Sequence, residues 1–311
     1  MPSKHAYLII AHGQFKQLSF LVSLLDHSRN DIYIHIDAKS KITEQDIEHI
    51  QESARFSKIQ FTERVSVYWG GYSQIESEMR LFKAASTGNY QSYHLLSGID
   101  LPIVPQSTIH NFFDNHKEYV FLTMMNTDGD DEDINRFKYY HYFEKFTYRS
   151  LPGFIGKLSF KLYRYGEVFV QKLLGIDNYR KYDISPVKAS NWVSLPNNIV
   201  QLIVSREDWI YDTFRHSFLC DELFIPMLLD KEGLLDKVYD LSVNYGTKDE
   251  FQGNLRYINW WDGKPYLWTD NIQDLEQLRY ASNNGYFFSR KFDLEQFPVT
   301  KQFILELTKE E

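Results

Sequence analysis

The feature that most constrains this fold is a regular alternation of apolar runs and helical segments over the first 125 residues. Apolar runs at 5–11, 31–37, 59–67 and 93–97 predict strands, and the segments between them repeat apolar residues at helical spacing. Helical crossovers between strands are typical of parallel sheets. We therefore predict an α/β fold in which a mixed, mainly parallel sheet is flanked by helices.

The same patterns predict where several helices lie. The spacing predicts helices over 15–25 and 43–56, and a third that Ser73 caps with Glu76 as the matching carboxylate. Further along the chain we expect a short strand at 193–195 and helices over 199–204 and 221–229. Pro226 is tolerable in the last of these because it falls in the first turn.

Two of the predicted strands end in carboxylates. Asp37 closes the second run, and the fourth runs into the turn Ser97-Gly98-Ile99-Asp100, after which Pro102 stops the strand. Open α/β sheets bind ligands at the carboxyl ends of their strands. The sequence therefore predicts a ligand site at this edge.

Composition narrows the class of protein. The 311 residues show no linker, so we expect a single domain. A net charge of -8 argues against nucleic acid as a partner. No apolar run is long enough to span a bilayer. One cysteine, Cys220, suits a reducing cytoplasm.

The middle of the chain differs from the rest. Residues 137–182 are rich in Tyr, Phe, Lys and Arg without a clean period, and basic residues outnumber acidic ones over 155–181. This segment has two interpretations. In the first it contacts a membrane surface, peripherally at the inner face of the membrane, or an anionic acceptor carrier. In the second it is a solvated helical face.

Several short motifs occur in a recognisable order. They are Ala6-Tyr7-Leu8-Ile9-Ile10-Ala11-His12, Tyr33-Ile34-His35-Ile36-Asp37, Val67-Tyr68-Trp69-Gly70-Gly71-Tyr72-Ser73, Leu95-Leu96-Ser97-Gly98-Ile99-Asp100-Leu101-Pro102, Ser190-Asn191-Trp192-Val193, Asp221-Glu222 and Ser289-Arg290-Lys291-Phe292-Asp293. In this order the chain resembles the family of core-2/I-branching β-1,6-N-acetylglucosaminyltransferases and peptide O-xylosyltransferases, in its small bacterial form, over about 5–295.

This resemblance implies a GT-A-like fold and a single glycosyltransferase domain, with a nucleotide-binding half at about 1–125 and an acceptor and catalytic half at about 126–311. It also implies transfer of a sugar, such as N-acetylglucosamine, xylose or a hexose, from a UDP-sugar with inversion and without a divalent metal or other cofactor. The acceptor would be a hydroxyl of a glycan or a lipid-linked saccharide in polysaccharide biosynthesis.

The resemblance also assigns the residues that carry the chemistry. Glu222 matches the family's catalytic base, which takes the proton of the acceptor hydroxyl; the alternative is an acid favoured by a helix N-terminus. Arg290 and Lys291 match the cations that bind the donor diphosphate, a task that suits the fork of an arginine. The alternative for this pair is an exposed basic surface.

Other positions receive binding roles. His12 and Asp37 are candidates for the nucleoside, and Asp100, Asn191, Trp192 and Asp221 are candidates for the acceptor or donor sugar. Trp192 stacks on a sugar or belongs to the core. Two positions depart from the family: Asn191 stands where relatives often carry Asp or Gln, and Lys264 stands near Pro265 where many carry Arg.

Competing classes are weaker. The acidic stretch Asp128–Asp133 offers an Asp-x-Asp pattern, but no apolar strand precedes it directly, so we interpret it as a solvated loop rather than a metal site. No phosphate-cradling glycine motif indicates a nucleotidyl- or phosphotransferase. A non-catalytic polysaccharide-binding protein remains the alternative.

Overall fold

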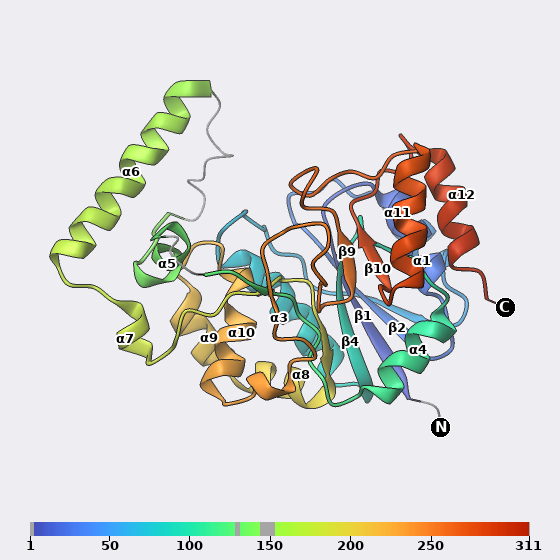
Figure 1. The fold of residues 1–311 in the computed structure, drawn as a ribbon, viewed down its shortest axis with the longest axis horizontal. Coiled ribbons are helices and arrows are strands. Elements are labelled where there is room, and N and C mark those ends of the chain that lie inside the picture. Colours follow the sequence, from blue (N-terminus) through green and yellow to red (C-terminus); the bar gives the residue numbers. More distant parts are fainter. Residues whose placement is uncertain (1–2, 128–130, 144–152, 311) are drawn as a thin grey trace.

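A five-stranded sheet forms the centre of the computed structural model, which describes residues 3–127, 131–143 and 153–310 (Figure 1). Its strand order is β3-β2-β1-β4-β7. The strands are β1 (Lys4–Ala11), β2 (Asn30–Ile36), β3 (Lys58–Phe61), β4 (Tyr90–Ser97) and β7 (Ser194–Pro196). Four strands pair in parallel, and β7 joins β4 antiparallel. The predicted mixed, mainly parallel sheet is confirmed.

Smaller sheets extend this layer. One has the order β5-β10-β9 and consists of β5 (Leu101–Pro102), β10 (Phe288–Arg290) and β9 (Arg256–Ile258). A pair is formed by β6 (Met124–Met125) and β8 (Val243–Asn244). Because β10 runs antiparallel to β5, it brings the C-terminal part of the chain beside the turn that follows β4.

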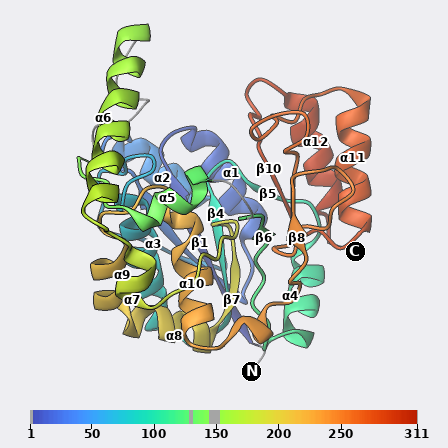
Figure 2. The ribbon, with the colours of Figure 1, turned by 60° about the vertical axis from the view of Figure 1, so that its left-hand side comes forward.

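Helices cover both faces of the central sheet (Figures 1 and 2). Along β1, Ala6 and Leu8 point to one buried cluster while Tyr7 and Ile9 point to the other, as the two-residue period of a strand requires. The first cluster contains residues of α3 (Ser73–Ser86), α8 (Asn197–Ser205), α9 (Glu207–Phe214) and α10 (Phe224–Lys231). The second contains residues of α1 (Phe15–Leu25), α2 (Glu44–Glu52), α4 (Gln106–Asn115), α11 (Ile272–Asn283) and α12 (Pro298–Leu307).

The segment without a clean period contains a long helix. The remaining elements are α5 (Asp131–Lys138), α6 (Gly153–Leu173), α7 (Asn178–Tyr182) and the 3-10 turns η1 (Cys220–Glu222) and η2 (Leu235–Lys237). In both views α6 stands away from the sheet, on the side opposite to α11 and α12 (Figures 1 and 2). Its inner face is anchored by hydrogen bonds that Glu167 and Gln171 form with residues 140–142.

Four local predictions were wrong in part. The helix expected over 43–56 ends at Glu52. The strand expected over 59–67 ends at Phe61, because the chain then leaves the sheet to bond with the residues that follow β2. Ser73 does not cap α3: its hydroxyl accepts from the Tyr68 N–H instead. The helix expected over 221–229 is divided into η1 and α10, and Pro226 does lie in the first turn of α10.

None of the helices that the structure describes combines the length and hydropathy needed to cross a membrane. The division into halves at about residue 125 stays a prediction.

Candidate active site

The carboxyl ends of three adjacent strands meet at one edge of the central sheet. The Asp37 N–H donates to the Ala11 carbonyl at 3.0 Å, which ties the end of β2 to that of β1. The Gly98 N–H donates to the Ile10 carbonyl at 2.9 Å, which ties β4 to β1. His12, Asp37 and Asp100 therefore follow neighbouring strands, as the sequence predicts for a ligand site.

The nucleoside candidates lie at the β1–β2 end of this edge. Asp37 is buried, and its Oδ1 accepts from the backbone of Lys39 at 2.9 Å and of Val67 at 3.3 Å. Lys39 Nζ lies 3.6 Å from Asp37 Oδ2 and 4.3 Å from the centre of the Tyr68 ring. The imidazole of His12 is exposed at this edge. A carboxylate, a cation and an aromatic face are thus available for a polar ligand.

At the β4 end of the edge, Asp100 holds Arg290. Arg290 Nη1 donates to Asp100 Oδ1 at 2.9 Å, and Asp100 Oδ2 accepts from the Ser97 N–H at 2.8 Å. The guanidinium lies 4.4 Å from the centre of the Trp192 ring. Burial raises the pKa of Asp100 although the Arg290 charge opposes this. Because one carboxylate bond uses a single N–H of the fork, the other donors of Arg290 stay available for an anion.

Asn191 leads from this group to a second carboxylate. Its Nδ2 donates to Asp221 Oδ2 at 3.2 Å, and Gln74 Nε2 donates to the same oxygen at 2.7 Å. Burial and the neighbouring Glu222 charge raise the pKa of Asp221 to about 7. Glu78, also buried, has its pKa raised by burial and by Asp221. These two carboxyls are buried beneath the predicted base.

Glu222 is held by basic residues that sequence reasoning missed. Arg136 Nη1 donates to Glu222 Oε2 at 3.1 Å, and Lys188 Nζ lies 3.7 Å from the same oxygen. Asp133 accepts from both cations at 2.8 Å. Among the residues described, Glu222 Oε1 accepts no hydrogen bond, and the side chain is 30% exposed. One carboxylate oxygen is therefore anchored and the other faces an accessible space.

The interpretation of Asp133 as part of a solvated loop was wrong. Asp133 lies in α5, and its carboxylate is 12% exposed because it neutralises Arg136 and Lys188. Asp128, Gly129 and Asp130 of the same stretch lie outside the described residues. Over residues 3–127, 131–143 and 153–310, no group of His, Cys, Asp and Glu is arranged to hold a metal ion.

Asn191 and Trp192 connect the two groups of charges. These consecutive residues precede β7, which pairs antiparallel with β4, so they lie at the carboxyl end of β4. Asn191 bonds to Asp221, next to Glu222, while the Trp192 ring covers Arg290. The structure thus brings Asp100, Asn191, Trp192 and Arg290 together with Asp221, as the sequence predicts, although they come from four separate motifs.

Two basic residues with predicted phosphate-binding roles are exposed. The side chain of Lys291 is exposed and forms no ion pair within the part of the chain that the structure describes. Lys264 is likewise exposed. The roles of Lys291 and Lys264 toward a phosphate stay predictions.

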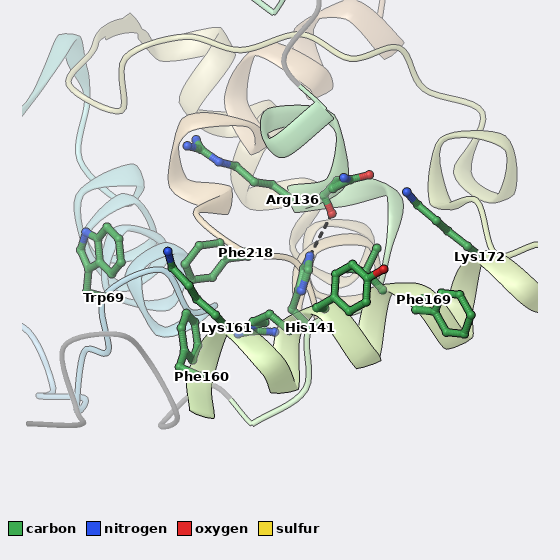
Figure 3. Close-up of a pocket in the computed structure, with 12 residues that line it drawn as sticks. Trp69, Arg136, His141, Phe160, Lys161, Phe169, Lys172 and Phe218 are labelled. Carbon is green, nitrogen blue, oxygen red and sulfur yellow. Dashed lines mark hydrogen bonds between the residues drawn. The ribbon is translucent and has the colours of Figure 1, made fainter. Parts of the chain in front are cut away.

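A groove lies between α5 and α6 (Figure 3). This α6 groove has a volume of about 630 Å³. It is lined by Trp69, Asn135, Arg136, His141, Phe160, Lys161, Arg164, Tyr165, Val168, Phe169, Lys172 and Phe218. Arg136 is shared with the Glu222 network, so the groove opens next to the predicted base rather than over the Arg290 group.

A glycine, Gly70, allows Trp69 and Phe218 to lie close together in the wall of the α6 groove that faces α6. Gly70 has a φ of +81°, and a Cβ added there would lie 2.4 Å from the ring of Phe218. The Trp69 ring meets the Phe218 ring edge-on at 5.8 Å between centres. The close approach of these two loops therefore depends on the missing side chain at position 70.

A family model described as "Core-2/I-Branching enzyme" matches residues 5–278. The chain belongs to this family. Its mixed, mainly parallel sheet flanked by helices is the α/β fold that the sequence predicts.

Curated relatives share low identity with the chain. A xylosyltransferase of Ciona intestinalis is 19% identical over 94% of this chain and 32% of its own length. Xylosyltransferase 2 of Rattus norvegicus is 21% identical over 97% of this chain and 33% of its own length. The family member therefore spans about a third of the length of the curated relatives it matches.

Two solved structures show a distant likeness. Mouse xyloside xylosyltransferase 1 in its apo form has 11% identity and a TM-score of 0.40, covering 92% of this chain and 96% of the mouse chain. Core-mannan synthase A of Aspergillus fumigatus in its Mn/GDP form has 11% identity and a TM-score of 0.36, covering 90% of this chain and 85% of the fungal chain.

Proposed function

We propose that this member of the Core-2/I-Branching enzyme family is a glycosyltransferase that moves a sugar from a UDP-sugar to a hydroxyl of a glycan or a lipid-linked saccharide, with inversion and without a divalent metal, in polysaccharide biosynthesis. The sugar is N-acetylglucosamine, xylose or a hexose, and the names of the relatives favour xylose. Peripheral membrane contact through residues 155–181, on the cytoplasmic side, belongs to the same proposal.

The observation that carries the proposal is the fixed position of Arg290 at the sheet edge. Asp100 and Trp192 hold its guanidinium, and unused donors remain for the diphosphate. When the bond from the anomeric carbon to the diphosphate oxygen breaks, its electron pair stays on UDP. A preorganised guanidinium stabilises that developing charge without moving. Lys291 adds a second cation next to it in sequence.

Glu222 supplies the matching base. Its Oε2 is anchored by Arg136, and its Oε1 is free of protein partners among the described residues. The acceptor hydroxyl gives its proton to Oε1 as its oxygen bonds to the anomeric carbon. Inversion follows if the acceptor attacks from the face opposite to the diphosphate. Asn191 and Trp192 then lie between Glu222 and Arg290, the cation proposed to bind the diphosphate, and the sugars would bind there.

A calorimetric titration tests the donor site. UDP is expected to bind about tenfold or more tightly than uridine in the presence of EDTA, because charge-assisted bonds to the diphosphate are worth about 1.5–3 kcal/mol each. Absence of UDP affinity would favour the polysaccharide-binding alternative. A requirement for manganese or magnesium would overturn the metal-free mechanism. Hydrolysis measured across several UDP-sugars would then identify the donor.

A further inference from the structure

The inner face of α6 is fixed to the rest of the protein. The Glu167 carboxylate accepts from His141, Tyr163, Arg164 and the Tyr142 N–H. Burial alone would raise its pKa, but these hydrogen bonds lower the pKa to about 2. The polar groups of this face therefore have partners within α6 and in the segment before it.

The outer face of α6 is apolar and exposed. Its large side chains follow each other at steps of three or four residues, which places them on one side of the helix. This outer stripe consists of Phe154, Leu158, Leu162, Tyr165, Phe169 and Leu173. Each of the six is between 46% and 80% exposed. A continuous apolar strip of this kind marks a surface that binds something.

Basic residues border the outer stripe. Lys157, Lys161 and Lys172 are exposed along α6, whereas its one acidic residue, Glu167, lies on the inner face. The protein as a whole carries a net charge of -8, so this concentration of positive charge is local. A helix with an apolar stripe flanked by lysines has the composition of one that lies in the interface of an anionic membrane.

The α6 groove opens beside the outer stripe, since Tyr165 and Phe169 belong to both. Figure 3 shows Lys161 and Lys172 extending from α6 toward the side of the groove where α5 lies. Neither forms an ion pair with any residue that the structure describes. A groove with unpaired cations and an aromatic wall suits an amphiphile that carries a phosphate.

We propose that the acceptor is a saccharide carried on a lipid phosphate, and that α6 lies on an anionic bilayer with its outer stripe among the lipids. The carrier enters the α6 groove, where its phosphate binds at Lys161 or Lys172, which lie eleven residues apart along the helix, and the saccharide reaches Glu222 past Arg136. This inference rests on the proposed transferase function and names its acceptor class.

Vesicle co-sedimentation tests the membrane surface. The full chain should bind phosphatidylcholine vesicles that contain phosphatidylglycerol more strongly than pure phosphatidylcholine vesicles. The double variant Leu162→Gln/Leu173→Gln should bind at least about tenfold more weakly, because two apolar side chains no longer leave water. The matched control Ile272→Gln/Tyr280→Gln changes two exposed residues of α11, at the opposite end of the molecule, and should bind like wild type.

Two outcomes would overturn the membrane assignment. One is equal binding to neutral and anionic vesicles, or none to either. The other is a lipid-free dimer in sedimentation equilibrium that the double variant Leu162→Gln/Leu173→Gln converts to monomer, because the stripe would then cover a second copy of the chain.

Titration with farnesyl phosphate, below its micelle concentration and with UDP saturating, tests the α6 groove. Farnesyl phosphate should bind more tightly than farnesol. Lys161→Ala/Lys172→Ala should weaken its binding by about tenfold or more. The control Lys117→Ala/Lys248→Ala, which removes two exposed lysines outside the groove, should not. Unchanged affinity in the Lys161→Ala/Lys172→Ala variant would refute the phosphate assignment.

UDP binding keeps this inference separate from the proposed function. If UDP binds normally to every variant but the lipid assays fail, the acceptor class is wrong and the transferase proposal stands. If wild type does not bind UDP, the proposed function itself fails, whatever the vesicles show.

Discussion

The Arg290 group and helix α6 differ in whether their charged and apolar side chains have partners within the protein. At the sheet edge, Arg290 is paired with the buried Asp100 and covered by Trp192. On α6, Lys161 and Lys172 lack acidic partners among the described residues, and the apolar stripe beside them faces outward. The first region holds its cation in a fixed position with protein partners, while the second carries exposed apolar surface and cations that have no acidic partner among the described residues.

This difference indicates what each region binds. A preorganised site loses little conformational entropy when a small charged ligand arrives, which suits a nucleotide-sugar of constant structure. An open surface with exposed apolar groups becomes stable only when an extended partner covers it, which suits a membrane and a carrier of variable length. Glu222 lies at the junction of the two regions.

The largest expected effect belongs to that junction. Glu222→Gln should lower the turnover number by roughly 10²- to 10⁴-fold, because the acceptor proton loses its base. UDP affinity, measured by calorimetry, should stay unchanged. Glu232→Gln is the matched control, since Glu232 also pairs with an arginine, Arg206, and should have no effect on turnover. Near-normal turnover in the Glu222→Gln variant would move the base to Asp221 or Asp100.

Core truncation should distinguish the two regions by stability. Leu8→Ala removes a fully buried side chain and should lower the free energy of unfolding by about 2–5 kcal/mol. Leu162→Ala removes one that is 64% exposed and should change it by less than about 0.5 kcal/mol. Urea denaturation followed by circular dichroism measures both. A large loss from Leu162→Ala would show that the outer stripe is part of a core, and the comparison would fail.

Acid should weaken the sheet region through buried histidines. Burial, with the Arg29 charge, lowers the pKa of His5 to about 4, and burial also lowers those of His94 and His110. Because these folded-state values lie below the unfolded value near 6.5, the stabilisation is complete above pH 6.5 and declines as pH falls toward 4. Each such histidine should cost roughly 2 kcal/mol between pH 7 and pH 5.

Urea denaturation at several pH values measures this slope. His110→Gln should make it shallower, whereas His49→Gln, an exposed position on α2, should leave it unchanged. Asp221, with its pKa raised to about 7, contributes an opposite slope in all three proteins, so only the differences between them matter. An unchanged slope in the His110→Gln variant would show that this histidine is not the source.

A smaller effect is expected at the diphosphate. Arg290→Ala should weaken UDP binding by about ten- to a hundredfold and leave uridine binding nearly unchanged, because only UDP carries the charges. Turnover should fall further, since charge grows on the leaving group. Equal weakening of both ligands would indicate a fold defect, which a thermal melt detects. Unchanged UDP affinity would remove the main support for metal-free transfer.

Much of the sheet and the order of the motifs could be predicted because both depend on local pattern. Apolar runs identify β1, β2 and β4, and the polar residues Asp37 and Asp100 follow the ends of two of these strands. The family's motifs contributed Glu222 and Arg290, which chain position alone does not distinguish from ordinary surface charges.

The rest depends on contacts between distant segments. Arg136 and Lys188 lie in no motif, and their place beside Glu222 follows from how α5 and the loop before β7 pack together. The sequence predicts a solvated Asp133 because one of its partners, Lys188, is distant in sequence and the other, Arg136, follows a run of acidic residues. One signal was available for α6: aromatic and leucine residues spaced by three and four among lysines.

The absence of a side chain at Gly70 makes the width of the α6 groove, the proposed acceptor site, sensitive to a single methyl group. Because its Cα lies too close to Phe218 for any side chain, even one methyl group would have to push Trp69 and its loop away from the Phe218 loop. Selection for a wider or narrower acceptor could therefore act at a position that touches no substrate. Family members with a larger residue at this position would be expected to accept different saccharides while keeping the same donor.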